Sequence, residues 1–338
     1  MIWIKRRSGG NQSPFWVSRG ITISDSSGTG NVGPLAPNDS YAQSATNTDG
    51  GFASFDIDGF TLGKGNSTAN ADAPYQRNNA NSATYVAWCW KAGGATTVAN
   101  TDGSIASAVS VNKEAGFSIV TYTGTNGNGT FGHGLGKAPK WIVIRRLDTA
   151  SSWVVYHESI GNTKRLTLDG ASGSSSSSGW WNNTSPTSTT VSVGTDAGHN
   201  GSTDGYVAYC WAEIPGYSKF GKYKGSGDAE GKHVYCGFKP AWVMIKKVSS
   251  GGTDWAIQDT TRDTINPTAY NTLAANKNDA EPQSGAGTFE GNFIDFVSDG
   301  FVLKSNAGTT NAENQSHIYM AFAEQPGTTA FATYPNAR

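Results

Sequence analysis

One pattern occurs three times in this chain of 338 residues, and it constrains the fold more than any other feature. Each copy starts with an apolar run that ends in two basic residues: Ile2 to Arg7, Trp141 to Arg146 and Trp242 to Lys247. Each copy closes with a run that mixes aromatic and small residues: Tyr85 to Trp90, Tyr206 to Trp211 and His317 to Phe322. Equivalent positions lie about 100 to 140 residues apart, whereas solenoid repeats have periods of about 20 to 50 residues. We therefore expect three related, domain-sized units.

These blocks divide the chain into a first repeat at 1–95, a second at 114–214, a third at 215–326 and a C-terminal tail at 327–338. The second and third repeats open with an extra segment, at Phe117 to Gly124 and Tyr217 to Gly225, which the first repeat lacks. If that segment is a strand, the first repeat has an unpaired sheet edge. We expect another chain or a neighbouring repeat to cover that edge.

Most blocks have the character of β-strands. They are short, rich in aromatic and β-branched residues, and bounded by Gly, Ser, Asn or Pro. In the first closing run Val86, Trp88 and Trp90 would face one side of a sheet, with Ala87 and Cys89 on the other. The connecting segments lack a sustained apolar stripe, so helical signals are weak. The sequence predicts an all-β fold of three tandem, related β-sandwich domains, jelly-roll-like, the first without its opening strand.

The charge of the chain excludes several kinds of partner. Only 15% of the residues are charged, and 25 Lys+Arg against 26 Asp+Glu leave a net charge of −1. Such a surface has no electrostatic footprint for nucleic acid or for an anionic membrane. No apolar run approaches the roughly 18 to 20 residues of a membrane span. We expect neither nucleic-acid binding nor membrane insertion, and a surface whose polarity comes from Ser, Thr, Asn and Gly.

Catalytic and metal motifs are not found. Cys89 and Cys210 share one repeat position where the third copy has Ala321, so that position favours a small buried residue over a redox or metal site. The five histidines lack the spacing of metal ligands. No nucleophile motif occurs, and glycosidase chemistry would need two carboxylates about 5 to 9.5 Å apart. We expect no metal, no cofactor and no enzymatic activity, with a glycan-cleaving enzyme as the minor alternative.

Aromatic residues in polar loops are the positive functional signal. Trp180, Trp181, Asn182 and Asn183 follow a serine run in the second repeat, and Trp255 flanks a polar loop in the third. Aromatic rings stack on sugar faces and Asn side chains bond hydroxyl groups, which makes these residues candidates for binding a glycan or a protein partner. The alternative is that Trp180 and Trp181 fold back over a sheet edge. The paired basic residues that end each first run have the pattern of solvated strand ends.

Several longer motifs resemble a known family. They are Trp3-Ile4-Lys5-Arg6-Arg7, Tyr85 to Gly94, Ala115 to Gly124, Gly132 to Lys140, Trp181 to Ser188 and Tyr319 to Glu324. Together they resemble repeated β-sandwich domains in virion structural proteins of marine bacteriophages, of the kind found in phages of picocyanobacteria and abundant marine heterotrophs, which are often associated with tails and fibres. The resemblance covers most of residues 1–326 and brings no catalytic residue.

The resemblance implies a virion structural protein, extracellular in the particle and assembled in the host cytoplasm. Our first expectation is a tail fibre or receptor-binding component that recognises host-surface polysaccharide. The alternative is a decoration or accessory protein of the capsid or tail that binds other virion proteins. Phage fibres are often trimers, so we expect a homo-oligomer, with a trimer as one candidate.

Overall fold

The structure is a computed structural model that describes residues 1–21, 34–42, 51–63, 77–94, 97–249, 252–262, 271–281 and 294–324. Within these described residues, strands account for 41% and helices for 5%, which confirms the all-β prediction. The predicted tail at 327–338 lies outside the described residues.

The first repeat contains a sheet and a hairpin. The antiparallel sheet has the order β2-β1-β5, and its strands are β1 (Ile2–Arg6), β2 (Phe15–Val17) and β5 (Tyr85–Cys89). The hairpin consists of β3 (Gly51–Phe55) and β4 (Phe60–Gly63). Because side chains alternate along a strand, Ile2 and Ile4 pack towards the aromatic residues of the hairpin while Trp3 faces the opposite side. Both faces of β1 and β2 are therefore buried, whereas β5 is only partly covered.

The second repeat is built on an eight-stranded sheet of order β13-β12-β11-β10-β15-β8-β7-β6. Its strands are β6 (Val98–Asn100), β7 (Ser107–Asn112), β8 (Phe117–Thr123), β10 (Trp141–Arg146), β11 (Val154–His157), β12 (Lys164–Thr167), β13 (Ser175–Ser176) and β15 (Gly205–Trp211). A smaller sheet pairs β9 (Gly129–Gly132) with β14 (Thr190–Val193). Strands β6 and β7 come from residues that lie between the first and second predicted repeats.

Three short helical turns lie in the connections of the second repeat. They are η1 (Glu158–Ile160), α2 (Ser178–Trp181) and α3 (Ala197–Asn200). Ser177 caps α2 by accepting from the Gly179 N–H, and Asp196 caps α3 by accepting from the Gly198 N–H. No helix in the described ranges is both long enough and apolar enough to cross a membrane.

The third repeat pairs a five-stranded sheet with a three-stranded one. The larger has the order β16-β23-β18-β19-β20, with β16 (Ser218–Lys224), β18 (Trp242–Lys247), β19 (Ala256–Asp259), β20 (Leu273–Ala274) and β23 (Ser316–Phe322). The smaller has the order β17-β22-β21, with β17 (Lys232–Tyr235), β21 (Ile294–Val297) and β22 (Gly300–Leu303). Both sheets are antiparallel.

The register of pairing shows which residues of the repeats are equivalent. In each main sheet the closing strand pairs with the strand of the first block: Ile2 with Cys89, Ile142 with Cys210 and Val243 with Ala321. By this register Lys5, Arg145 and Lys246 occupy one position. The closing strands β15 and β23 also pair on their other side, with β8 and β16. In the first repeat β5 is instead the last strand of its sheet.

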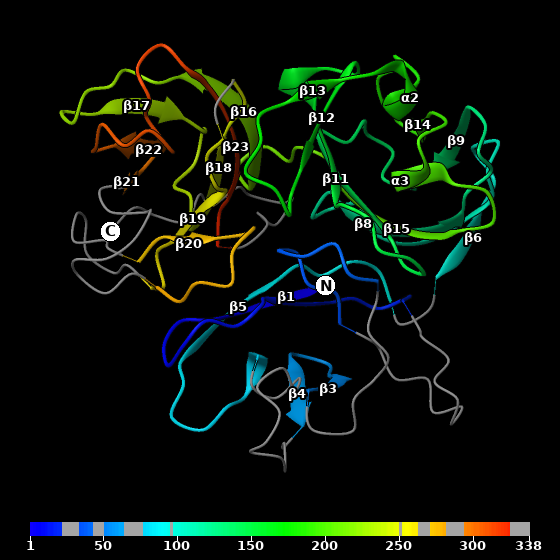
Figure 1. Ribbon diagram of the computed structural model, residues 1–338, viewed down its shortest axis with the longest axis horizontal. Helices are drawn as coiled ribbons and strands as arrows, with labels where there is room; N and C mark the ends of the chain where they lie inside the picture. The colour runs from blue at the N-terminus through cyan, green and yellow to red at the C-terminus, as the bar shows by residue number, and fades with distance from the viewer. Residues whose placement is uncertain are drawn as a thin grey trace.

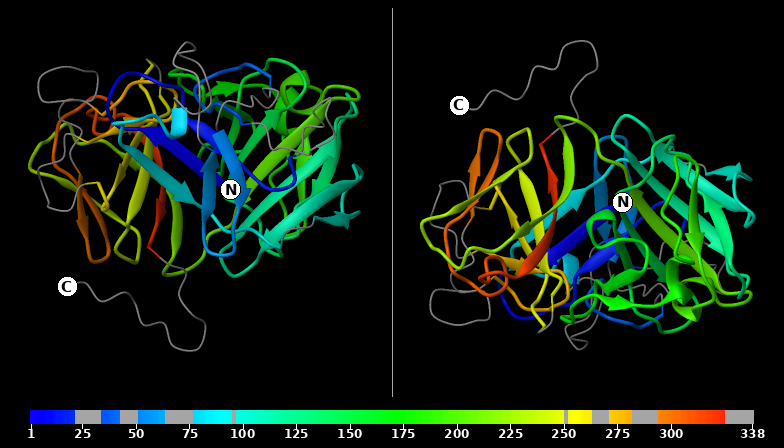
Figure 2. Two further views of the ribbon diagram at one scale, coloured as in Figure 1. Left: turned by 90° about the horizontal axis from the view of Figure 1, so that it is seen from below. Right: turned by 90° about the horizontal axis from the view of Figure 1, so that it is seen from above.

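The three repeats lie around a common centre, with the first below, the second at upper right and the third at upper left in Figure 1. Seen from below and from above, the sheets of all three repeats again converge there (Figure 2). Tryptophans from each repeat meet at this centre: the Trp90 ring lies 6.3 Å from Trp211 and 5.5 Å from Trp242, between centroids. One continuous hydrophobic core therefore spans all three repeats.

Candidate functional site

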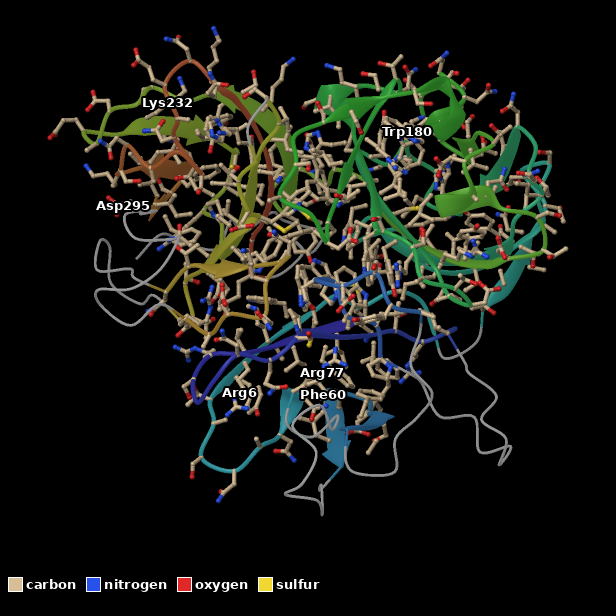
Figure 3. All side chains as sticks on the ribbon, in the orientation of Figure 1. Arg6, Phe60, Arg77, Trp180, Lys232 and Asp295 are labelled. Carbon is tan, nitrogen blue, oxygen red and sulfur yellow. The ribbon has the colours of Figure 1, made fainter. Side chains whose placement is uncertain are left out.

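Trp180 and Trp181 lie in the core of the second repeat. Trp180 is 6% exposed and Trp181 is 1% exposed. The Trp181 indole Nε1 donates to the Lys164 carbonyl at 2.8 Å, and the Arg165 guanidinium covers the Trp180 ring at 4.5 Å. The interpretation of these two residues as exposed stacking rings is wrong, because both rings of the capped turn α2 are buried. Figure 3 shows the position of Trp180.

The two asparagines beside them are exposed. Asn182 and Asn183 both have φ of 49°, a left-handed conformation that Asn tolerates and that ends α2. Their position therefore follows from the turn. No exposed ring from α2 stands next to them, so the predicted combination of aromatic shelf and amide side chains is not formed.

Trp255 is also buried, at 0% exposure. Its Nε1 donates to the Thr167 carbonyl of the second repeat at 2.9 Å, and the Lys246 ammonium lies 5.5 Å from its ring. The equivalent Trp153 donates to the Ala36 carbonyl of the first repeat at 2.9 Å. The prediction of an exposed Trp255 is therefore wrong, and the structure gives it a contact between repeats.

Three buried cations form a second set of contacts between repeats. Lys5 Nζ donates to the Lys277 carbonyl at 2.7 Å, Lys246 Nζ donates to the Ala171 carbonyl at 2.6 Å, and the Arg145 guanidinium donates to the Tyr41 carbonyl. All three side chains are at most 1% exposed. Burial lowers the pKa of Lys5 to about 7, of Lys246 to about 8 and of Arg145 to about 10. The prediction of solvated strand ends is wrong for Arg6, Arg145 and Lys246, all of which are buried.

A third set of contacts closes the ring in the other direction. The Ser18 hydroxyl bonds the Tyr209 hydroxyl at 3.0 Å, and His157 Nε2 lies 3.3 Å from the Tyr319 carbonyl. The Trp88 indole donates to the Asp259 carboxylate at 3.0 Å. By register, Ser18, His157 and Asp259 occupy one position. Each repeat therefore bonds both neighbours, and the first is bonded to the third.

The interface between the first and third repeats also holds a network of ion pairs. Arg262 bonds Asp259 at 2.6 Å and Glu281 at 2.8 Å, and both Arg262 and Asp259 are nearly fully buried. Glu281 in turn bonds Arg7 of the first repeat at 2.7 Å. Because breaking one member would leave buried charge uncompensated, this network fixes the two repeats against each other.

A cavity of about 600 Å³ lies where the first repeat meets the eight-stranded sheet. Met1, Cys89 and Trp90 line it from the first sheet, Phe55 to Phe60 line it from the hairpin, and Ser110 and Ile119 line it from β7 and β8. Phe60 lies between the hairpin and the sheet of β1 and β5 in Figure 3. A second cavity of about 280 Å³ shares Gly93, Gly94 and Ser110 with the first and continues along β6 and β7. The larger volume falls in the range of ligand sites.

Two sheet edges border this space. Strand β5 ends its sheet, and Ala87 and Cys89 are exposed along it. Strand β4 pairs with β3, whereas its counterpart β22 pairs on both sides. The predicted cover by a neighbouring repeat is therefore not found among the described residues. Open edges offer backbone donors and acceptors in a row, so the cavity is suited to an extended segment that adds as a strand.

The sequence contained one signal for this cavity, the missing opening segment of the first repeat. The predicted binding residues Trp180 to Asn183 and Trp255 do not line it. Among the described residues no group of three or more His, Cys, Asp or Glu side chains is arranged to hold a metal ion. Cys210 and Cys236 are buried free thiols and Cys89 is an exposed one. Burial raises the pKa of Cys236 to about 12 and raises that of Cys89 as well.

A family described as a domain of unknown function, DUF7483, matches residues 1–326. The chain belongs to this family. The match covers the sequence blocks of all three repeats. No curated protein and no solved structure matches the chain.

Proposed function

We propose that this DUF7483 chain is a structural protein of a bacteriophage virion that acts by binding other virion proteins. The core that spans all three repeats is the observation that supports this role most, because it makes the repeats one rigid body. The surface of that body is poor in charge and rich in Ser, Thr and Asn, which suits hydrogen-bonded contacts with neighbouring subunits. The motifs that resemble marine phage virion proteins support the same assignment.

We further propose that the three repeats are tandem β-sandwich domains of jelly-roll-like form. The face-to-face sheets support this interpretation. In the second repeat Val120 and Tyr122 of the large sheet share a buried cluster with Phe131 and Val191 of the small one. The first repeat does the same with the β3–β4 hairpin as its second layer.

Within the virion we favour an accessory role on the capsid or tail over recognition of host glycans. The receptor-binding hypothesis relied on Trp180, Trp181 and Trp255 as stacking rings, and all three are buried. A protein interface does not require such rings, because backbone edges and neutral polar loops supply the contacts. A homo-oligomer, including a trimer, is part of this proposal.

Mass spectrometry of purified particles from the phage that encodes this chain, followed by its localisation in a particle reconstruction, tests the proposal. We expect the chain to be present in fixed stoichiometry, with its loops against other virion proteins. Its absence from purified particles would overturn the virion assignment. Binding of the folded protein to a glycan array, together with a free distal position in the particle, would overturn the accessory role and favour receptor binding.

A further inference from the structure

We propose that residues 329–335, in the C-terminal tail of this same chain, form the missing strand of the first repeat and pair antiparallel with β5. This strand would occupy the cavity beside the hairpin. Its peptide linker would then join the third repeat to the first. The inference concerns contacts within one chain, so it does not depend on a role in the virion.

The linkers after the closing strands support this assignment. Strand β15 is followed by Ala212-Glu213-Ile214-Pro215-Gly216, and β23 by Ala323-Glu324-Gln325-Pro326-Gly327. The first linker leads into β16, which carries Phe220 and Tyr223. The same offsets after the second linker give Phe331 and Tyr334. The tail therefore repeats the pattern of an opening strand.

The connectivity of the ring gives this strand its destination. Strand β15 belongs to the second repeat, but the strand that follows it, β16, pairs with the closing strand of the third repeat. In the same way β8 follows the first repeat and pairs with the closing strand of the second. The chain thus passes from each of these closing strands to the opening strand of the next repeat, directly from β15 to β16 and through β6 and β7 from β5 to β8. The repeat that follows the third one around the ring is the first.

The register can be transferred residue by residue. Ser218 pairs with Phe322, and Tyr223 pairs with His317. The same register sets Thr329 opposite Trp90, Ala330 opposite Cys89 and Tyr334 opposite Tyr85.

An aromatic pair marks the far end of this register in the other two repeats. Tyr122 stacks on Tyr206 with centroids 5.3 Å apart, and Tyr223 stacks on His317 at 5.1 Å. Tyr334 on Tyr85 would make the third such cross-strand pair.

An asparagine clamp holds the turn after each described opening strand. Asn200 Oδ1 accepts from the Thr125 N–H at 2.9 Å, and Asn311 Oδ1 accepts from the Ser226 N–H at 2.8 Å. Asn79 holds this position in the first repeat and is exposed. In the proposed register the Ala337 N–H is the group that Asn79 would bind.

The ends of the two strands are already close, which favours the same chain over a second copy. The ring of Phe322, the last residue of β23, lies 5.6 Å from the ring of Trp90, next to the end of β5. Residues 323–328 would then bridge two repeats with a linker as long as residues 212–217, which connect β15 to β16. A linker longer than residues 323–328 is therefore not required.

The native thiol of Cys89 provides the test. In the full-length chain, the new thiol of Ala330→Cys would lie directly opposite Cys89, at about 4.5 to 5.5 Å between Cα atoms, within the range for a disulfide. Thr333→Cys is the matched control, since three residues along a strand place it roughly 10 Å away. After mild oxidation we expect an intramolecular disulfide between Cys89 and the introduced thiol in the Ala330→Cys variant, seen by non-reducing electrophoresis and peptide mass mapping. We expect none in the control.

Three results would overturn the proposal. A lack of linkage to Cys89 in the Ala330→Cys variant would exclude the strand, equal yields in both variants would exclude the register, and covalent dimers would assign the strand to a second copy. Hydrogen exchange gives an independent measurement on the full-length chain. Phe331→Ala should speed exchange of the β5 amides about tenfold or more while the amides of β15 stay unchanged, and unchanged β5 exchange would also count against the strand.

Discussion

Buried cations that donate to carbonyl groups are the most demanding side chains in this molecule. Lys246 is 0% exposed, so its ammonium group has lost its hydration. It donates hydrogen bonds to carbonyl groups instead, among them that of Ala171 in another repeat. An unpaired buried ammonium would be strongly unfavourable, so each such bond is required for the repeats to pack. The neighbouring Lys247 is only partly buried, although the two residues have the same chemistry.

Lys246→Ala should therefore lower the free energy of unfolding by about 2 to 4 kcal/mol, because it leaves buried carbonyls without a donor. Lys247→Ala is the matched control and should stay within about 0.5 kcal/mol of the native chain. Urea denaturation followed by tryptophan fluorescence measures both. Equal losses in the two variants would show that Lys246 does not hold the second and third repeats together.

His157 should make stability depend on pH. Its Nδ1 accepts from the Ser159 N–H at 3.0 Å and its Nε2 faces the Tyr319 carbonyl, so the neutral ring satisfies both nitrogens. Burial lowers its pKa from 6.5 to about 4. Between these two values the unfolded chain binds a proton that the folded chain does not, so stability falls as pH drops from 6.5 to 4, by roughly 3 kcal/mol for this group.

Thermal unfolding measured from about pH 8 to about pH 4 checks this dependence. His157→Gln, which keeps a donor for the Tyr319 carbonyl, should flatten the slope in the window where His157 titrates. His233→Gln is the matched histidine substitution at an exposed position. The remaining slope in His157→Gln should come in part from His317, whose pKa burial also lowers to about 4. An unaltered slope in His157→Gln would contradict the assignment.

Strands were predictable from the sequence because their signals are local. The runs Trp141 to Arg146 and Tyr206 to Trp211 carry β-branched and aromatic residues between turn residues. Both are strands, and the second begins one residue earlier, at Gly205. The direction of a loop side chain was not predictable. Trp180 and Trp181 lie in a single helical turn, and only the packing of α2 on the sheet decides that their rings face inward.

Contacts between repeats could not be predicted from the sequence either, because they depend on how distant segments pack. In the sequence, a basic residue near a strand end looks the same whether its side chain faces water or a distant carbonyl. Lys5 is an example, because it bonds the carbonyl of Lys277, 272 residues away. The cavity beside β5 was indicated by the sequence because it depends on an element that is missing from the first repeat. Its lining from the second sheet, through Ser110, depends on β7, which no repeat motif predicted.

The β6–β7 hairpin depends on one close backbone contact. A Cβ atom on Gly103, between the two strands, would lie 2.3 Å from the Thr130 carbonyl oxygen. Gly103→Ala should therefore push the hairpin away from β9 and speed amide exchange in β6 and β7, with little change in β15. Gly127→Ala is the control because that position has open space. Equal exchange in both variants would show that the hairpin is held by its strand pairing alone.

The whole ring should unfold as one unit. Trp90, Trp211 and Trp242 come from three repeats and meet at one centre, so no repeat can open without exposing the rings of the other two. Calorimetry should give one transition with equal calorimetric and van't Hoff enthalpies. Three separable transitions would instead indicate repeats with independent cores.

The contacts at the position of Ser18, His157 and Asp259 differ in kind. One is a hydroxyl pair, one joins an imidazole to a backbone carbonyl, and one joins a carboxylate to an indole N–H. Each surface fits its own neighbour and mismatches the other two, since Asp259 set against a carbonyl would bring two acceptors together. The chemistry of the junctions therefore specifies the order of the repeats. In a crowded assembly of identical chains, this mismatch discourages a repeat from inserting into the wrong place of another copy.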